Sequence, residues 1–334
     1  MKTTYKALLC GAAAVAAVGI AYAMDERFFE KAKDKLTVFK CRANSKIMEQ
    51  ALPLTDAMFP GPKVVSGADS AKKIPEVLKE LNVNKVMIVT GPTVGRTIVP
   101  PIAENLERHG IGYTIYDQVE ANPSVKTVEA IRAQYLENGC DGFLAIGGGS
   151  PMDAAKAAAA RVAKPNTPIG KMAGLMKVMI KVAPIVAVPT TSGTGSEVTM
   201  GAVISDHDER HKYAIMDPNL VPKYAVLDPK LTVSMPKFVT ATTGIDALTH
   251  AVESYVTWAY NNNASNRNAE EAVVKIFRNL KRAYEDGNDL EAREAMLIAS
   301  YKAGLAFNHT GVGYVHAIAH AMGGIYNTAH GLAN

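Results

Sequence analysis

The sequence predicts an α/β protein in two parts, a Rossmann-like parallel sheet followed by an all-helical region. From Lys85 onward, short apolar runs alternate with segments at helical spacing, which is the pattern of parallel βαβ units. After Pro236 the strand-like runs stop, and long apolar stretches at helical spacing take over. The length of 334 residues exceeds what one hydrophobic core usually supports, so we expect two domains.

The elements of the first part follow one another closely. We expect strands at 85–90, 112–117, 142–149, 184–191 and 224–228, and helices at Val94–His109, Val125–Asn138 and Pro151–Val162. We expect this α/β domain, which would bind a nucleotide, to span residues 58–234.

The second part reads as helices at Ala241–Tyr255, Asn266–Tyr284, Leu290–Phe307 and Val315–Met322. We expect a helical domain over 235–334, with the boundary near Ser234. A cleft between two such domains is where a ligand is expected.

Residues 1–57 are read as an N-terminal extension. Its segment 7–23 is an uncharged, Ala-rich run that follows two lysines and ends in a small-x-small pattern. A signal peptide, a weak membrane anchor and an Ala-rich helix are all compatible with that pattern. We expect a membrane partner only if segment 7–23 acts as an anchor.

Composition is typical of a globular protein, with 48% hydrophobic and 20% charged residues. The formal net charge of +4 is small, and no stripe of Lys and Arg with interleaved aromatic residues is present. We therefore do not expect a nucleic acid partner. The three cysteines, Cys10, Cys41 and Cys140, lack metal-ligand spacing, which favours a reducing compartment over a disulfide framework.

A glycine-rich turn, "AIGGGSPMDAAK" at 145–156, follows one of the predicted strands. We expect Ser150 at the N-cap and Pro151 at the first helical position. Glycines let backbone amides approach a ligand, and a helix N-terminus carries free N–H groups that suit a diphosphate. The alternative is an ordinary tight turn with a good cap.

A second loop, "PTTSGTGSEVT" at 189–199, also follows a predicted strand. Its hydroxyl groups can donate hydrogen bonds to phosphate or carboxamide oxygens, although alone it could be a solvated polar loop. Both loops follow parallel strands, where open α/β sheets bind ligands, and together they favour a nucleotide. After the first strand, Gly91 stands where an acidic side chain would contact an adenosine ribose, and it can neither bind the ribose nor repel a 2'-phosphate.

Histidines gather near the C-terminus in a pattern that suggests a metal site. Asp246 and His250 lie four residues apart in a predicted helix, so both emerge on one face. His316, His320 and His330 follow within one short segment. An Asp/His₃ set would suit Fe(II) or Zn(II), but spacing alone does not decide between His316 and His320. The remaining histidines, His109, His207, His211 and His309, read as surface residues.

Five motifs in order resemble the iron-containing (group III) alcohol dehydrogenase family, the branch with lactaldehyde reductase and 1,3-propanediol dehydrogenase. They are "GGGSPMDAAK", "PTTSGTGSEVT", "DPKL", "TGIDALTHAVESY" and "HAIAHAMGGIYNTAHG", and the resemblance runs from about Pro62 to Asn334. It implies a dehydroquinate synthase-like fold. It also implies that Asp246, His250, His316 and His330 bind the metal and that His320 lies near the nicotinamide as a catalytic residue.

The resemblance also assigns the coenzyme contacts. It points to ten positions, counting Asp153 of the glycine-rich motif: Gly91, Asn122, Gly148, Gly149, Ser150, Asp153, Thr190, Thr191, Thr194 and Lys212. The family often carries Asp where Gly91 stands here, so both NAD and NADP are compatible with the sequence.

The function implied is hydride transfer between a short-chain alcohol or aldehyde and NAD(P), with Fe(II), or Zn(II), as a Lewis acid. The alternatives are a zinc-dependent non-redox lyase of the dehydroquinate synthase type, or an inactive metal- or nucleotide-binding fragment. The family's helical domain normally continues beyond "HGLAN", so we expect a C-terminally truncated chain. We also expect a homodimer or higher homo-oligomer, and a cytoplasmic location because the nicotinamide pool is cytosolic.

Overall fold

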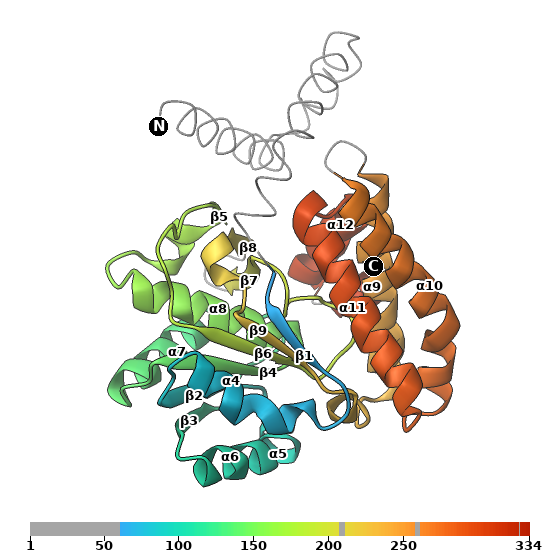
Figure 1. The fold of residues 1–334 in the computed structure, drawn as a ribbon. Helices are drawn as coiled ribbons and strands as arrows, with labels where there is room; N and C mark the ends of the chain where they lie inside the picture. The colour runs from blue at the N-terminus through green and yellow to red at the C-terminus, as the bar shows by residue number, and fades with distance from the viewer. Residues whose placement is uncertain (1–60, 207–210, 258–260, 327) are drawn as a thin grey trace, which may run out of the picture.

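The computed structural model describes residues 61–206, 211–257, 261–326 and 328–334, which form an α/β body beside a group of helices (Figure 1). The extension predicted at 1–57, with its signal-like segment 7–23, lies outside the described residues. Within these described ranges, no helix combines the length and the hydropathy needed to cross a membrane.

The main sheet has six strands in the order β1-β9-β6-β4-β2-β3, and every neighbouring pair is parallel. The strands are β1 (Lys63–Ser66), β2 (Lys85–Val89), β3 (Gly112–Tyr116), β4 (Gly142–Gly147), β6 (Ile185–Pro189) and β9 (Tyr224–Leu227). The predicted Rossmann-like parallel sheet is confirmed. Strand β1, which the sequence analysis did not assign, adds to one edge of it.

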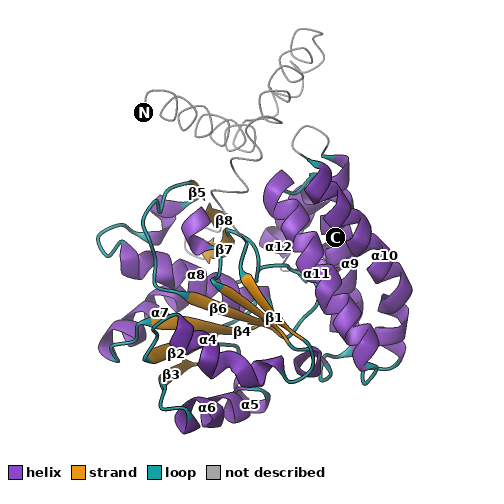
Figure 2. Cartoon of the chain, in the orientation of Figure 1, coloured by secondary structure: helices purple, strands orange, loops and turns teal. Residues whose placement is uncertain are grey.

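Helices cover both faces of this sheet (Figure 2). They are α4 (Ile74–Glu80), α5 (Pro92–Thr97), α6 (Val99–Arg108), α7 (Val125–Glu137) and α8 (Gly149–Ala163). In β4, Phe143 and Ala145 pack in one apolar cluster with residues of α7 and α8, whereas Leu144 and Ile146 pack with residues of α4 and α6. Alternate residues of a strand point to opposite faces, so a continuous apolar run is what a doubly covered strand requires.

The single helix predicted at Val94–His109 is wrong, because the chain forms two helices there that meet at Ile98. Pro100 and Pro101 follow at once. Neither has an N–H to donate to the preceding turn, so a continuous helix would leave two carbonyl groups unpaired. The chain instead begins α6 with the prolines in its first turn, where no donor is needed.

A small second sheet was not predicted. It has the order β5-β8-β7 and contains β5 (Gly174–Leu175), β7 (Gly201–Asp206) and β8 (His211–Met216), with β7 and β8 antiparallel. The N–H of Val203 in β7 donates to a carboxylate oxygen of Asp153 in α8 at 3.0 Å. This bond joins the small sheet to the helix that follows the glycine-rich turn.

The C-terminal part is helical, as predicted, and stands beside the sheet in Figure 1. Its helices are α9 (Lys237–Val256), α10 (Asn263–Glu285), α11 (Leu290–Thr310), α12 (Tyr314–Tyr326) and the short α13 (His330–Ala333). Earlier in the described part of the chain lie the 3₁₀ turns η1 (Ser70–Lys73), η2 (Ile169–Met172), η3 (Pro218–Leu220) and η4 (Pro229–Thr232). Asn262 and Ser265 form a reciprocal capping box at the start of α10, which fixes that helix end.

The two parts share an apolar contact. Ala225 and Leu227 of β9 pack against Leu297 and Tyr301 of α11. The sheet and the helices are therefore not joined only by their connecting chain.

A buried lysine fixes the loop after β6. The ammonium group of Lys156 in α8 is fully buried, and its three N–H groups share five oxygens of Ser196, Thr199 and Gly201 that lie 2.7 to 3.3 Å from Nζ. Burial lowers the pKa of Lys156 to about 8, against the raising effect of the Asp153 and Glu197 carboxyl groups. The loop is thereby tied to the helix that begins at the glycine-rich turn.

We predict that Lys156→Met destabilises the chain by about 3–5 kcal/mol, because it removes the cation from a buried set of acceptors and acids. Equilibrium urea denaturation measures this loss. The control is Lys126→Met, at an exposed position in α7, which we expect to change stability by less than about 0.5 kcal/mol. Equal midpoints for the two variants would contradict the role of Lys156.

Candidate active site

One cavity of about 640 Å³ contains most of the predicted site residues from both parts of the chain. Its walls include, from the α/β part, Asn122, Gly149, Ser150, Asp153, Thr194 and Lys212, and, from the helical part, Asp246, His250, His316, His320 and His330. The two sets were predicted from separate motifs, and the fold brings them to the same space.

The glycine-rich turn passes directly from β4 into α8. Helix α8 begins at Gly149 with Gly148 as its N-cap, so the prediction of Ser150 as the N-cap is wrong. Ser150 lies within the first turn, and its hydroxyl accepts the N–H of Asn122 at 3.3 Å. Gly148 has no side chain to cap the helix, so the N–H groups of its first turn can face a ligand.

The second loop packs against the glycine-rich turn, which explains why glycines are needed there. A Cβ on Gly148 would lie 3.2 Å from Oγ1 of Thr191, and a Cβ on Gly149 would lie 3.0 Å from Cγ2 of Thr194. The N–H of Thr190 donates to the carbonyl of Gly147 at 2.9 Å. The two predicted phosphate loops therefore form one continuous wall.

The same loop also touches the helices. A Cβ on Gly193 would lie 2.6 Å from Thr243 of α9, and the Gly193 carbonyl accepts from Nδ1 of His250 at 3.3 Å. Gly195 has φ +60°, and a Cβ there would lie 2.7 Å from Cα of Gly304 in α11. Only residues without a side chain permit this close approach between loop and helices.

Asn122 and Lys212 meet on the sheet side of the cavity. The ammonium of Lys212 in β8 donates to Oδ1 of Asn122 at 2.8 Å. Asn122 takes the left-handed conformation, with φ +57°, which Asn tolerates better than most residues. Burial lowers the pKa of Lys212, against the raising effect of Asp153.

Four residues predicted to contact the coenzyme do not line this cavity. They are Gly91, Gly148, Thr190 and Thr191. Gly91 occupies the N-cap position of α5, just after β2. The other three lie where the glycine-rich turn and the second loop pack against each other.

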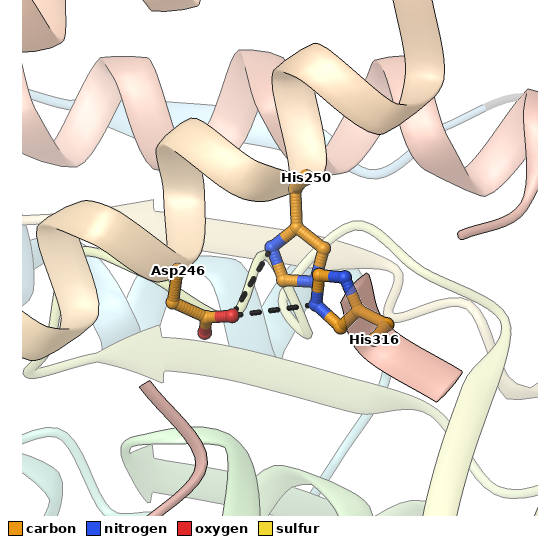
Figure 3. Close-up of side chains that lie close together, drawn as sticks. All are labelled: Asp246, His250 and His316. Carbon is orange, nitrogen blue, oxygen red and sulfur yellow. Dashed lines mark ion pairs between the residues drawn. The ribbon is translucent and has the colours of Figure 1, made fainter. Parts of the chain in front are cut away.

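The predicted metal ligands gather around one carboxylate oxygen. Asp246 and His250 extend from the same face of α9 toward His316 of α12, as Figure 3 shows, and ligand atoms of the three lie within 4.8 Å of one another. Oδ1 of Asp246 lies 3.4 Å from Nε2 of His316. The rings of His250 and His316 stack with centroids 4.2 Å apart, and Phe307 covers the other face of His250 at 4.1 Å.

His330 completes the cluster. Its Nε2 lies 3.5 Å from Oδ1 of Asp246. The amide nitrogen of Asn334 lies between these groups, 2.6 Å from Asp246 Oδ1, 3.4 Å from His316 Nε2 and 3.5 Å from His330 Nε2. A hydrogen-bond donor thus stands where these atoms converge, the place that would suit a cation.

The pKa values of the cluster favour one carboxylate anion, two neutral rings and one protonated ring. Burial raises the pKa of Asp246, but the neighbouring His250, His316 and His330 outweigh it and lower that pKa to about 2. Burial lowers the pKa of His250 to about 4 and also lowers that of His330. Burial also acts to lower the pKa of His316, but hydrogen bonds to Asp246 and Glu253 raise it to about 9. An ionised carboxylate and neutral imidazoles are the forms that bind metal ions, so His316 would release a proton on metal binding, whereas Asp246, His250 and His330 are already in the binding form.

His320 lies beside the cluster rather than within it. Its ring centroid is 6.2 Å from that of His316 and 5.1 Å from that of His330. Burial, together with the charges of His330 and Lys212, lowers the pKa of His320 to about 3. His320 is therefore a neutral imidazole at the wall of the cavity.

Two of the histidines predicted at the surface differ in their exposure to solvent. His109 is partly exposed and lies 3.7 Å from Glu76, in agreement with the prediction. His309 is half-buried, lines the cavity and lies 3.1 Å from the Asn262 amide nitrogen, so its ring is less open to solvent than that of His109. His207 lies outside the described residues, as does the side chain of His211.

Sequence reasoning missed Glu253, which is buried and contacts Nδ1 of His316 at 2.7 Å. A signal was present, since Asp246, His250 and Glu253 are spaced i, i+4 and i+7 and so share one face of α9. The prediction used only Asp246 and His250 of these three residues.

Comparisons with known proteins match nearly the whole described chain. Residues 61–229 match the family described as iron-containing alcohol dehydrogenase, and residues 240–334 match the Fe-containing alcohol dehydrogenase family, C-terminal. The chain is 36% identical over 282 residues to an NAD-dependent methanol dehydrogenase of Bacillus methanolicus. It is 34% identical over 273 residues to lactaldehyde reductase of Escherichia coli K12.

The fold is similar as well. A crystal structure of 1,3-propanediol oxidoreductase superposes with a TM-score of 0.79 at 35% identity, and the match covers 82% of this chain and 72% of that one. The methanol dehydrogenase match covers 84% of this chain and 73% of the relative, and the lactaldehyde reductase match covers 80% and 70%. These proteins support the resemblance inferred from the five motifs and the fold expected from it.

We predict that Gly195→Ala destabilises the chain by about 1–3 kcal/mol, because a Cβ at this left-handed position meets the backbone of α11. The midpoint of urea unfolding measures the change. Gly201→Ala is the matched control, since a Cβ there has nothing within 4 Å, and it is expected to stay within about 0.5 kcal/mol of the parent. Unchanged stability of Gly195→Ala would contradict the close packing of loop and helices.

Proposed function

The chain belongs to the iron-containing alcohol dehydrogenase family, and from that premise we propose how its residues carry out hydride transfer between a short-chain alcohol or aldehyde and NAD(P). The observation that carries the proposal is the shared cavity. Residues suited to a diphosphate and residues suited to a divalent metal line the same space of about 640 Å³. A substrate bound at the metal would therefore lie next to the coenzyme.

The metal would be held by Asp246, His250, His316 and His330. One carboxylate and three imidazoles suit Fe(II), with Zn(II) as the other candidate. Four ligands at about 2.1 Å from an ion in tetrahedral geometry lie about 3.4 Å apart. The distances of 3.4 and 3.5 Å from Asp246 Oδ1 to His316 and His330 agree with that spacing. When bound, such an ion supplies Lewis acidity, which lowers the pKa of an alcohol and polarises a carbonyl group.

The coenzyme would lie on the wall formed by the two loops. Uncapped N–H groups at Gly149 and Ser150 suit the diphosphate, and Thr194, Asn122, Asp153 and Lys212 line the space that continues from them to the histidines. The two loops that form this wall would be held together by contacts of Gly148, Thr190 and Thr191, which do not themselves line the cavity. The Bacillus relative is described as NAD-dependent, and Gly91 carries no carboxylate to repel a 2'-phosphate, so the proposal includes NAD and NADP.

His320 would move the proton of the alcohol. Its neutral ring lines the cavity next to His330, and it can accept a proton on one nitrogen while the other donates. Because the pKa of His320 is lowered, a proton that its ring accepts would be released again readily.

The similarity to alcohol dehydrogenases and aldehyde reductases favours hydride transfer over the zinc-dependent lyase alternative. The alternative of an inactive binding protein is an outcome of the experiment below. Homodimer or higher assembly and a cytoplasmic location stay predictions.

We predict that Asp246→Ala and His330→Ala each lose bound metal and lower kcat/KM for aldehyde reduction by more than about 100-fold, because each removes a ligand of the ion. Metal content by mass spectrometry and NAD(P)H absorbance with a panel of short aldehydes measure the two effects. His109→Ala, at a partly exposed position, is the control and should change neither.

Full metal content and activity in Asp246→Ala or His330→Ala would contradict the ligand assignment. Zinc without redox turnover in the parent protein would favour the lyase. Nucleotide or metal binding without any turnover would favour the inactive binding protein.

A further inference from the structure

Glu253 lies behind the predicted metal ligands and holds one of them in place. Its carboxylate is buried and receives three hydrogen bonds, from Nδ1 of His316 at 2.7 Å, from the N–H of Gly313 at 2.8 Å and from the N–H of Val315 at 2.6 Å. An ionised carboxylate only accepts hydrogen bonds, so Nδ1 of His316 carries the proton in this contact.

This contact determines which nitrogen of His316 faces the cluster. With Nδ1–H directed at Glu253, Nε2 is the nitrogen on the opposite side of the ring, and it lies 3.4 Å from Asp246 Oδ1. A second hydrogen bond of this kind fixes the tautomer and the orientation of a metal-binding histidine and increases its basicity. Nε2 of His316, the nitrogen that can bind a metal, therefore faces the cluster.

The same carboxylate fixes the start of α12. Gly313 and Val315 donate two of the N–H groups that no turn of helix can satisfy at a helix N-terminus. A Cβ on Gly313 would lie 2.8 Å from a carboxylate oxygen of Glu253, so glycine permits the approach. Because Glu253 extends from α9, it ties the helix with His316 and His320 to the helix with Asp246 and His250.

We propose that Glu253 is a positioning residue for the metal centre, which holds His316 through Nδ1 and so raises the affinity of the site for a divalent metal. The inference rests on the proposed metal site and adds a residue to it that touches neither metal nor coenzyme. If Glu253 only stabilised the fold, its replacement would lower the free energy of unfolding. The metal affinity of the folded chain would then stay unchanged.

The test compares the parent chain with Glu253→Gln and Glu253→Asp. Glutamine keeps the shape but has one acceptor oxygen, so at least one of the three donors loses its acceptor. Aspartate keeps the charge on a shorter stem. Glu270→Gln, at an exposed position in α10, is the matched control.

Affinity for Zn(II) and Co(II) is measured by competition with a chromophoric chelator, and the visible spectrum of the Co(II) form reports the ligand geometry. Urea denaturation of each metal-free variant measures its fold. We expect Glu253→Gln to remain folded and to bind metal about 10- to 100-fold more weakly, with an altered Co(II) spectrum. Glu253→Asp should recover part of the affinity, and Glu270→Gln should match the parent.

Parent-like affinity and spectrum in folded Glu253→Gln would overturn the positioning role and leave the proposed function intact. Failure of the parent chain itself to bind either metal would overturn the proposed function, and the positioning role with it.

Discussion

The buried ammonium of Lys156 is the interaction on which the shape of the site depends. Its three N–H groups share five oxygens of Ser196, Thr199 and Gly201, and so fix the loop after β6 against α8. On its other side the loop meets the helices through Gly193 and Gly195, where any side chain would collide with α9 or α11. One short loop therefore sets the distance between the glycine-rich turn and the histidines. Burial raises the pKa of Glu197 in this loop to about 7, although the charge of Lys156 acts to lower it.

Asp246 has the corresponding role among the helices. Its carboxylate is the one strong anion at the centre of three imidazoles, and its pKa, lowered to about 2, keeps it ionised across the neutral range. Glu253 lies on the same face of α9, two turns further along, and accepts a hydrogen bond from Nδ1 of His316. The two carboxylates of α9 thus contact both nitrogens of the His316 ring, which belongs to α12. These contacts fix the position of α12 relative to α9.

The alternation of strands and helices and the step to an all-helical region were predictable because apolar periodicity is a local property. Asp246 and His250 were predictable as a pair because four residues make one helical turn. Spacing could not separate His316 from His320, since they too are one turn apart, and only the packing of α12 on α9 brings His316 toward Asp246. The pairing of β7 with β8 was missed because the apolar runs inside them, 202–204 and 213–216, are short and have polar or charged residues beside them. The break at Ile98 was missed although Pro100 and Pro101 stood in the sequence, because the apolar spacing continued through them.

The most direct measurement of the central claim is anomalous X-ray scattering from crystals of the chain grown with Zn(II), or with Fe(II) under anaerobic conditions, in the presence of NAD. We predict one strong peak bounded by Asp246, His250, His316 and His330, with density for a diphosphate at the start of α8 in the same cavity. A peak elsewhere, or a metal whose ligands exclude Asp246, would contradict it.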